Sequence, residues 1–513
     1  MRWSETKENA HILVNASISS SDGNDYKIID LFGESGANEF QGDFGFPLDE
    51  ELDLKDRLQQ EQKHLQISGA LHDVRFDFSH NESNSEYFYV APAVEDGSIR
   101  KTNDSRFTIG YNKDISEPLN FDAQISYNDH QTEEIYDALF PGFIGYRTLD
   151  FYAWNYEARL SYTPSENLNI VSGFERQSMF DEHEVTHVPA RYVENEVVNR
   201  VERTTNAIYS QLNFKISEKL RTVVGVRVEE QLAYRREYFE NIELDTTPSR
   251  IGNFKKIRNT TPRVSLIYQP NPSQVFKLMA GDAIKLVNRR RSDLIDEEYQ
   301  TIEANYVYTQ EKFLFSASVF KNTMKNLLVE SIYVTGKDSS GKNTTATYTT
   351  SSGDISTNGI ELLLKTDWTE SFNSEIGATW QNSENRSSPT GEVSFSPELV
   401  SNFKLNYHRN NFAAALLVRY VSSMFPQYTE PAIVDEMDSV EGQYSGHRVP
   451  GHIVADLSFR LDDIWDLGYV SLQLTNIFDQ EVRYPNNALN SYLLHNGTIG
   501  NGRGARITLG IDF

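Results

Sequence analysis

The stretch FTIGYNKDISEPLNFDAQISY (Phe107–Tyr127) decides how this chain folds. Its first part alternates large apolar residues (Phe107, Ile109 and Tyr111) with small or polar ones, and the last seven residues repeat the pattern. Alternation with a period of two places the apolar side chains on one face of a strand. The central KDISEPLN, with its proline and charged residues, is typical of a turn. The stretch therefore predicts two antiparallel strands joined by a short turn, each with one apolar face.

The same alternation recurs along the rest of the chain. It returns at 156–162, 212–216, 264–268, 403–407 and 453–461. A sustained helical period is not found in the sequence. The sequence therefore predicts an all-β protein.

Short and long connections alternate between the predicted strands. The short ones are turn-like segments such as TPSENLN and SEKLR. The long ones are predicted at 21–65, 81–104, 129–151, 179–205, 231–258, 286–297, 322–353, 384–395, 423–449 and 481–503. A soluble sandwich lacks this strict sidedness, and a β-propeller would repeat every forty or so residues. About twenty strands with such connections predict a large antiparallel transmembrane β-barrel, with short periplasmic turns, long extracellular loops and both chain ends at the periplasmic side.

The composition excludes several other classes of protein. The chain has 513 residues, no cysteine, a formal net charge of -26 and a mean hydropathy of -0.53. No stretch approaches the eighteen or so consecutive apolar residues of a membrane helix, and disulfides and cysteine-bound zinc are excluded. The acidic balance argues against nucleic-acid binding. The 12% of aromatic residues argues against a disordered acidic chain.

The chain ends in a strand of the same kind. Ile507, Leu509, Ile511 and Phe513 alternate with polar residues or glycine, and the last residue is aromatic. In a barrel the last strand pairs with the first, which removes the open edge of the sheet. We interpret these four residues as the signal by which outer-membrane barrels are presented to the barrel-assembly machinery.

Three segments near the end resemble the closing strands of TonB-dependent outer-membrane receptors. They are VPGHIVADLSFRL (Val449–Leu461), LQLTNIFDQEVRY (Leu472–Tyr484) and GRGARITLGIDF (Gly502–Phe513). In that family a Pro-Gly strand with a later Asp precedes an Asn-Leu-Phe-Asp segment and a Gly-Arg turn. The middle element here reads Asn476-Ile477-Phe478-Asp479, followed by Tyr484. Residues 275–328 are also similar to the family's central hairpins.

The resemblance implies a fold and a function. The family has 22 strands, a plug domain inside the barrel and a TonB box before the plug; neither segment is found before Ala10. We therefore expect residues 1–513 to be one barrel domain, truncated at the N-terminus and without the plug. The resemblance implies an outer-membrane receptor for a scarce nutrient, with a ferric siderophore as the commonest cargo, TonB as a partner through the missing region, and no cofactor or enzymatic activity. A passive porin-like channel and a surface adhesin remain alternatives.

Aromatic loop residues are the candidate ligand-binding residues. Exposed rings on outer loops can stack on a planar ligand, although aromatic girdles also place Tyr and Phe near strand ends without any ligand. The candidates are Tyr87, Phe88, Tyr89, Phe140, Phe143, Tyr146, Phe425, Tyr428 and Tyr444, with His447 beside them.

Two further motifs have residue types that occur in binding sites. Arg289, Arg290 and Arg291 could attract an anionic ligand or the phosphate of lipopolysaccharide, or be a solvated run balanced by the acids that follow. HEVTH (His183–His187) matches the zinc-protease pattern, which works only on a helix. It falls in a predicted long loop, so we expect no metal site.

Overall fold

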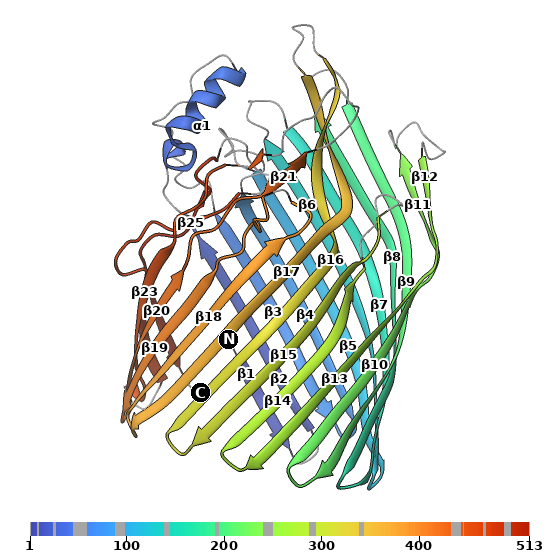
Figure 1. The fold of residues 1–513 in the computed structure, drawn as a ribbon, viewed down its shortest axis with the longest axis vertical. Helices are drawn as coiled ribbons and strands as arrows, with labels where there is room; N and C mark the ends of the chain where they lie inside the picture. Colours follow the sequence, from blue (N-terminus) through green and yellow to red (C-terminus); the bar gives the residue numbers. More distant parts are fainter. Residues whose placement is uncertain are drawn as a thin grey trace.

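The computed structural model describes fifteen stretches of the chain and assigns nearly all of them to strands. They are residues 2–7, 10–23, 27–44, 59–87, 98–137, 144–189, 194–239, 250–286, 294–337, 343–388, 390–431, 443–444, 446–464, 468–486 and 494–511. Figure 1 shows long, tilted strands curving around a common axis, with short turns at one end and longer connections at the other.

Over the described residues, the large sheet has 25 strands, of which four lie at the loop end and 21 form the wall. The wall strands are β1 (Arg2–Lys7), β2 (Ala10–Ser21), β3 (Gln60–Leu71), β4 (Val74–Tyr87), β5 (Ser98–Ser116), β6 (Leu119–Asp137), β7 (Ile144–Ser165), β8 (Leu168–Pro189), β9 (Glu194–Ser217), β10 (Leu220–Gln231), β13 (Ile257–Asn271), β14 (Gln274–Lys285), β15 (Glu297–Gln310), β16 (Phe313–Lys337), β17 (Asn343–Thr369), β18 (Phe372–Asn385), β19 (Leu399–Arg409), β20 (Phe412–Val421), β23 (His452–Leu461), β24 (Gly468–Thr475) and β27 (Gly504–Ile511). Each pairs antiparallel with the next. The predicted large antiparallel barrel is confirmed.

The remaining elements lie at the loop end (Figure 1). They are β11 (Tyr234–Phe239), β12 (Arg250–Phe254), β21 (Tyr428–Pro431) and β22 (Gln443–Tyr444) of the large sheet, the separate pair β25 (Arg483–Tyr484) and β26 (Thr498–Ile499), and the helix α1 (Ile28–Phe44).

The two faces of the wall differ as the alternation predicts. On β5 and β6, Phe107 and Ile125 point outward and are 45% and 41% exposed. Between them in register, Thr108 and Ser126 face inward, are nearly buried, and their hydroxyl oxygens lie 2.9 Å apart. An apolar outer face suits a lipid environment, and the polar inner face suits a hydrated lumen.

Several predicted long links are continuations of strands. β16 and β17 have 25 and 27 residues and stay paired as far as Lys337 and Asn343, inside the predicted link 322–353. β8 likewise runs to Pro189. Beyond the membrane both faces of a strand meet water, so the apolar alternation disappears while the backbone ladder continues. Hydrophobic periodicity alone therefore ends these strands too early.

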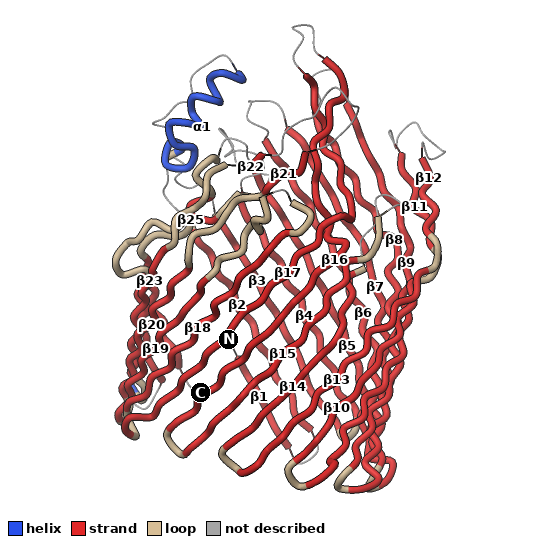
Figure 2. Tube along the Cα trace, in the orientation of Figure 1, coloured by secondary structure: helices blue, strands red, loops and turns tan. Residues whose placement is uncertain are grey.

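A helix was not predicted, and α1 lies inside the predicted link 21–65. It is the helix in Figure 2, beside the loop-end connections. Leu31 and Phe32 are buried, and the carbonyl oxygen of Asp30 accepts a hydrogen bond from Arg483 at 3.1 Å. The helix is kinked at Gly33. The kink interrupts the regular apolar stripe by which a straight helix is predicted from sequence. In the described part of the chain, no helix is both long and apolar enough to span a membrane.

The ends of the wall differ from the prediction. Arg2 in β1 pairs with Asn15, partway along β2, so β1 starts within the wall and not at the short-turn end (Figure 1). The prediction for the N-terminal end was wrong because six residues without alternation were not counted as a strand. β27 pairs with β24, and among the described residues no ladder joins it to β1.

Candidate functional site

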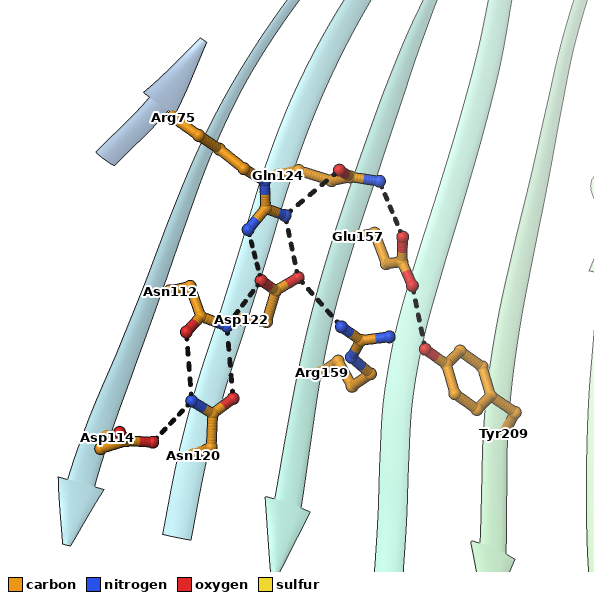
Figure 3. Close-up of polar contacts among 9 residues, drawn as sticks. All are labelled: Arg75, Asn112, Asp114, Asn120, Asp122, Gln124, Glu157, Arg159 and Tyr209. Atoms are coloured by element: carbon orange, nitrogen blue, oxygen red, sulfur yellow. Dashed lines mark hydrogen bonds and ion pairs between the residues drawn. The ribbon is translucent and has the colours of Figure 1, made fainter. Parts of the chain in front are cut away.

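The inner face of β4 to β7 carries a network of charged side chains (Figure 3). Arg75 donates to both carboxylate oxygens of Asp122, at 2.6 and 3.1 Å. Arg159 lies 3.5 Å from the same carboxylate, and the amide of Asn112 donates to it at 2.9 Å. Asp122 is 5% exposed. One buried anion thus holds two guanidinium groups, because such a group is stable only when it is fully paired.

A second chain of polar contacts continues the network toward β9. Gln124 donates to one carboxylate oxygen of Glu157 at 2.9 Å, and the hydroxyl of Tyr209 donates to the other at 3.0 Å (Figure 3). The ring of Tyr209 lies over Gly173, where a Cβ atom would sit 2.5 Å from it. Only a glycine leaves room for the tyrosine to reach across the wall.

Closer to the loop end, the inner face carries another group of ion pairs. Arg100 contacts Glu134 at 2.6 Å, and Arg147 bridges Glu134 and Glu184 at 3.5 and 2.9 Å. Both carboxylates are about nine-tenths buried or more. Hydrophobic alternation does not indicate these residues, because it records only the apolar face of each strand. Opposite charges at inward positions of adjacent strands are the sequence signal that could have indicated them.

The aromatic residues predicted between 423 and 449 do come together. Tyr444 stacks on Phe425 with ring centroids 5.4 Å apart and contacts Tyr428 at 5.0 Å. The guanidinium of Arg448, which was not predicted, lies 4.5 Å above the Phe425 ring. The backbone N–H of His447 donates to the carbonyl of His495 at 2.6 Å. We call Phe425, Tyr428, Tyr444, His447 and Arg448 the mouth cluster.

The mouth cluster is held by a small hydrophobic anchor. Val449 and Met424 are buried at 1% and 8% exposure, and their backbones exchange two hydrogen bonds of 2.9 and 3.1 Å. Met424 follows the end of β20, and Val449 precedes the start of β23. The anchor therefore lies where the chain enters and leaves the long connection between these two strands. The rings are therefore presented at the loop end of the wall on a fixed base, and such a surface can stack on a flat or cationic ligand group.

Residues of the three segments that resemble the family form contacts with one another and with the closing strands. Asp456 accepts hydrogen bonds from the backbone N–H of Asn476 and from Arg419, both at 2.8 Å. Asp479, in the loop after β24, accepts from the backbone N–H of Arg503 at 2.9 Å and from its side chain at 3.2 Å. These contacts lower the pKa of Asp479. The motifs therefore join β20 and β23 to the connection between β24 and β27, and they also join the two ends of that connection, which is a structural role.

The terminal strand has the predicted faces. Ile507 and Leu509 point outward and are 72% and 76% exposed. Gly510 faces the other way, against the ring of Tyr469, and Arg460 lies 3.7 Å over that ring. The backbone of Ile511 continues the strand, and Phe513 lies outside the described residues. The assembly role of these residues stays a prediction.

The other predicted ligand residues are not brought together by the described structure. Tyr87 ends β4, and Tyr146, near the start of β7, is 37% exposed. The remaining ones, Phe88, Tyr89, Phe140, Phe143, Arg289, Arg290 and Arg291, lie outside the described residues.

The HEVTH segment lies on β8, so its placement in a loop was wrong. Positions four apart on a strand are about 13 Å apart, too far for one zinc ion, and Glu184 is paired with Arg147. Over the described ranges, no group of three or more potential metal ligands is found.

Several solved structures resemble this chain in fold. The solved structures that resemble the chain include the ferric enterobactin receptor PfeA of Pseudomonas aeruginosa (TM-score 0.71, 13% identity, 99% of this chain and 76% of that one). The ferric yersiniabactin uptake receptor FyuA of Yersinia pestis gives 0.69 and 13%, over 99% and 75%. The copper transporter OprC gives 0.70 and 13%, over 98% and 76%. At these identities the likeness shows the fold alone. No curated protein matches the sequence significantly.

The family assignment rests on the sequence itself. The model of the TonB-dependent receptor-like β-barrel matches residues 22–478, which is most of the chain. The matched range contains the charged inner wall, the mouth cluster and the Asn476–Phe478 segment. This chain belongs to the TonB-dependent receptor β-barrel family.

Proposed function

We propose that this chain is the barrel wall of an outer-membrane receptor that imports a ferric siderophore with energy supplied through TonB. The observation that carries the proposal is the mouth cluster, in which three rings and a guanidinium lie at the loop end of a polar lumen. Ferric siderophores present planar groups and often negative charge, and both suit aromatic rings beside an arginine.

The proposal extends the function of two of the similar structures to this chain. By their names, one is a receptor for ferric enterobactin and the other an uptake receptor for ferric yersiniabactin, whereas a third similar structure is a copper transporter. The proposal also includes a plug and a TonB-binding segment encoded ahead of Met1. Reading the gene upstream of this codon tests that part directly.

Uptake of labelled iron tests the transport. Cells that express the gene from its upstream start are given ⁵⁵Fe bound to a catecholate, a hydroxamate or a mixed siderophore, with and without a protonophore. We expect one class to be imported and the protonophore to abolish its import. Import that survives the protonophore supports a passive channel instead, and an absence of import from every class overturns the siderophore proposal.

Binding to the mouth cluster is tested separately. Replacing Tyr444→Ala removes the ring that contacts both Phe425 and Tyr428. Loss of stacking is worth about 0.5–1.5 kcal/mol per pair, so we expect affinity for the imported siderophore to fall roughly 3- to 10-fold in a fluorescence titration. Tyr162→Ala is the matched control, because Tyr162 is 44% exposed on the outer face of β7. Equal affinities in both variants would remove the cluster from the site.

A further inference from the structure

A groove of about 610 Å³ lies on the outer face of β7 and β8. Arg176 lies in it among five aromatic side chains: Tyr152, Trp154, Tyr156, Phe174 and Phe180. Trp154 and Tyr156 are nearly parallel, 6.2 Å apart between ring centroids, and Tyr152 stacks on Phe180 at 5.4 Å. A single cationic side chain is thus surrounded by rings on the surface that faces lipid.

The register of β8 shows that Arg176 points away from the lumen. Phe174, two residues before it, is outward and 42% exposed. Glu175, between them, faces inward and contacts Arg227 across the inner wall. Alternate residues of a strand face opposite sides, so the guanidinium of Arg176 is outside the barrel and shares no surface with the luminal ion pairs.

The position along the strand places Arg176 in the outer half of the membrane. Arg176 lies eight residues from Leu168, where β8 leaves the short-turn end. At about 3.3 Å per residue and a tilt of about 40°, it stands roughly 20 Å above that turn. It pairs in register with Tyr156, which is about 15 Å above the level of Tyr162 and about 10 Å below that of Tyr152 on β7. Its Nε donates to Ser178 at 3.3 Å, two residues closer to the loop end. The side chain is therefore directed toward the headgroups, as cationic residues in membranes are.

Among the residues that the structure describes, Arg176 has no anionic partner. Its cross-strand neighbours are Tyr156 and Asn206, which are neutral. Within the described ranges no carboxylate forms an ion pair with it, and its two terminal nitrogens have no protein acceptor. In a chain with a net charge of -26, an unpaired arginine at this depth is costly unless an anion from outside pairs with it.

We propose that Arg176 and this aromatic groove form a binding site for the phosphate of lipopolysaccharide, the anionic lipid of the outer leaflet. The planar guanidinium offers the two terminal nitrogens that a phosphate accepts in a fork. The rings of Trp154 and Phe174 contact the first carbons of the acyl chains, and Ser178 holds the guanidinium in place. The proposal rests on the outer-membrane location and not on the cargo, so it stands or falls independently of siderophore transport.

Lys321 provides a matched control. It lies on β16, eight residues from Phe313 at the short-turn end, as Arg176 does on β8. It also faces outward, because Val319, two residues before it, is 54% exposed, and it pairs in register with Ile302. It lacks the surrounding rings. A general attraction of cations to the membrane surface would involve both residues equally, whereas a built site involves Arg176 alone.

The test is a titration of the purified full chain in detergent with bisphosphorylated lipid A, its dephosphorylated form and inorganic phosphate. Bound lipid is counted by native mass spectrometry. We expect bisphosphorylated lipid A to bind at least 10-fold more tightly than the dephosphorylated form. We expect R176Q to lose about 10-fold, R176K to lose less, and K321Q to match the wild type. Heat-modifiable gel mobility verifies that each variant is folded.

Each opposite result overturns the proposal. R176Q with wild-type affinity, or K321Q with an equal loss, removes the built site. Equal binding of the dephosphorylated lipid removes the phosphate, and displacement of lipid A by millimolar inorganic phosphate makes free phosphate the ligand. If R176Q does not fold, R176K and the comparison of the two lipids on the wild type decide the question.

Discussion

Asp122 shows what a single residue decides in this wall. Its carboxylate is 5% exposed and lies between Arg75 and Arg159. Both arginines are close to half exposed, so water screens part of their charge and the ion pairs contribute less than a fully buried pair would. Asp122 is important because its single carboxylate contacts side chains from three other strands, β4, β5 and β7.

Asp122→Asn is expected to lower the free energy of unfolding by about 1–3 kcal/mol. The substitution keeps the shape and removes the charge, which leaves two guanidinium groups facing each other. Urea unfolding of the protein in lipid vesicles measures the change. Asp114→Asn is the control, since Asp114 is exposed and accepts one hydrogen bond from Asn120; about 0.5 kcal/mol or less is expected there. Equal losses in the two variants would contradict the role given to Asp122.

At the scale of elements, the terminal strand illustrates how the two faces of one strand meet different surroundings. Leu509 is 76% exposed on the outer face, and its neighbour Thr508 faces inward. Two residues on, Gly510 accommodates the ring of Tyr469 on the inner face. The same eight-residue strand therefore faces lipid on one side and packs polar and aromatic groups on the other.

Leu509→Lys should impair assembly of the barrel, and Thr508→Lys should not. A lysine on the lipid face costs about 2–4 kcal/mol near the middle of the membrane and less toward its surface, whereas an inward lysine remains hydrated. The measurement is the fraction of heat-modifiable, folded protein in outer-membrane preparations of cells expressing each variant. If Thr508→Lys is the more harmful change, the assignment of faces is wrong.

At the scale of the whole molecule, the aromatic residues on the outer face mark two levels. Tyr162 and Trp368 lie near the short-turn end and are 44% and 60% exposed, while Trp154 lies eight residues from Tyr162 on β7, toward the loop end. Tyr162 and Tyr152 are ten residues apart on β7, which corresponds to about 25 Å along the barrel axis at the usual tilt. This spacing matches the apolar band of an outer-membrane barrel.

Single-tryptophan variants should report these levels. With the other four tryptophans of the chain changed to phenylalanine, Trp154 or Trp368 alone should be quenched more by lipids brominated near the headgroup than by lipids brominated deep in the chain. A tryptophan introduced by Leu364→Trp, five residues above the end of β17 on its outer face, should show the reverse order. The same order at all three positions would contradict the proposed membrane placement.

The sequence by itself determined the kind of fold, because every residue of a barrel strand faces either lipid or lumen and the alternation records that choice locally. The pattern from Phe107 to Tyr127 sufficed for a hairpin, and the closing motifs sufficed for the family. It also indicated Phe425, Tyr428, Tyr444 and His447 as candidate ligand-binding residues, because aromatic residues are frequent in the loop that contains them.

Only the tertiary structure decided what depends on the neighbouring strand. The pairing of Asp122 with Arg75 spans 47 residues of sequence, and the extension of β16 and β17 depends on backbone hydrogen bonds that carry no side-chain signal. The helix α1 and the outward Arg176 are similar cases, because burial of Phe32 and the isolation of one guanidinium are set by residues remote in the chain. Periodicity specifies which side a residue faces, whereas register specifies which residue it meets there.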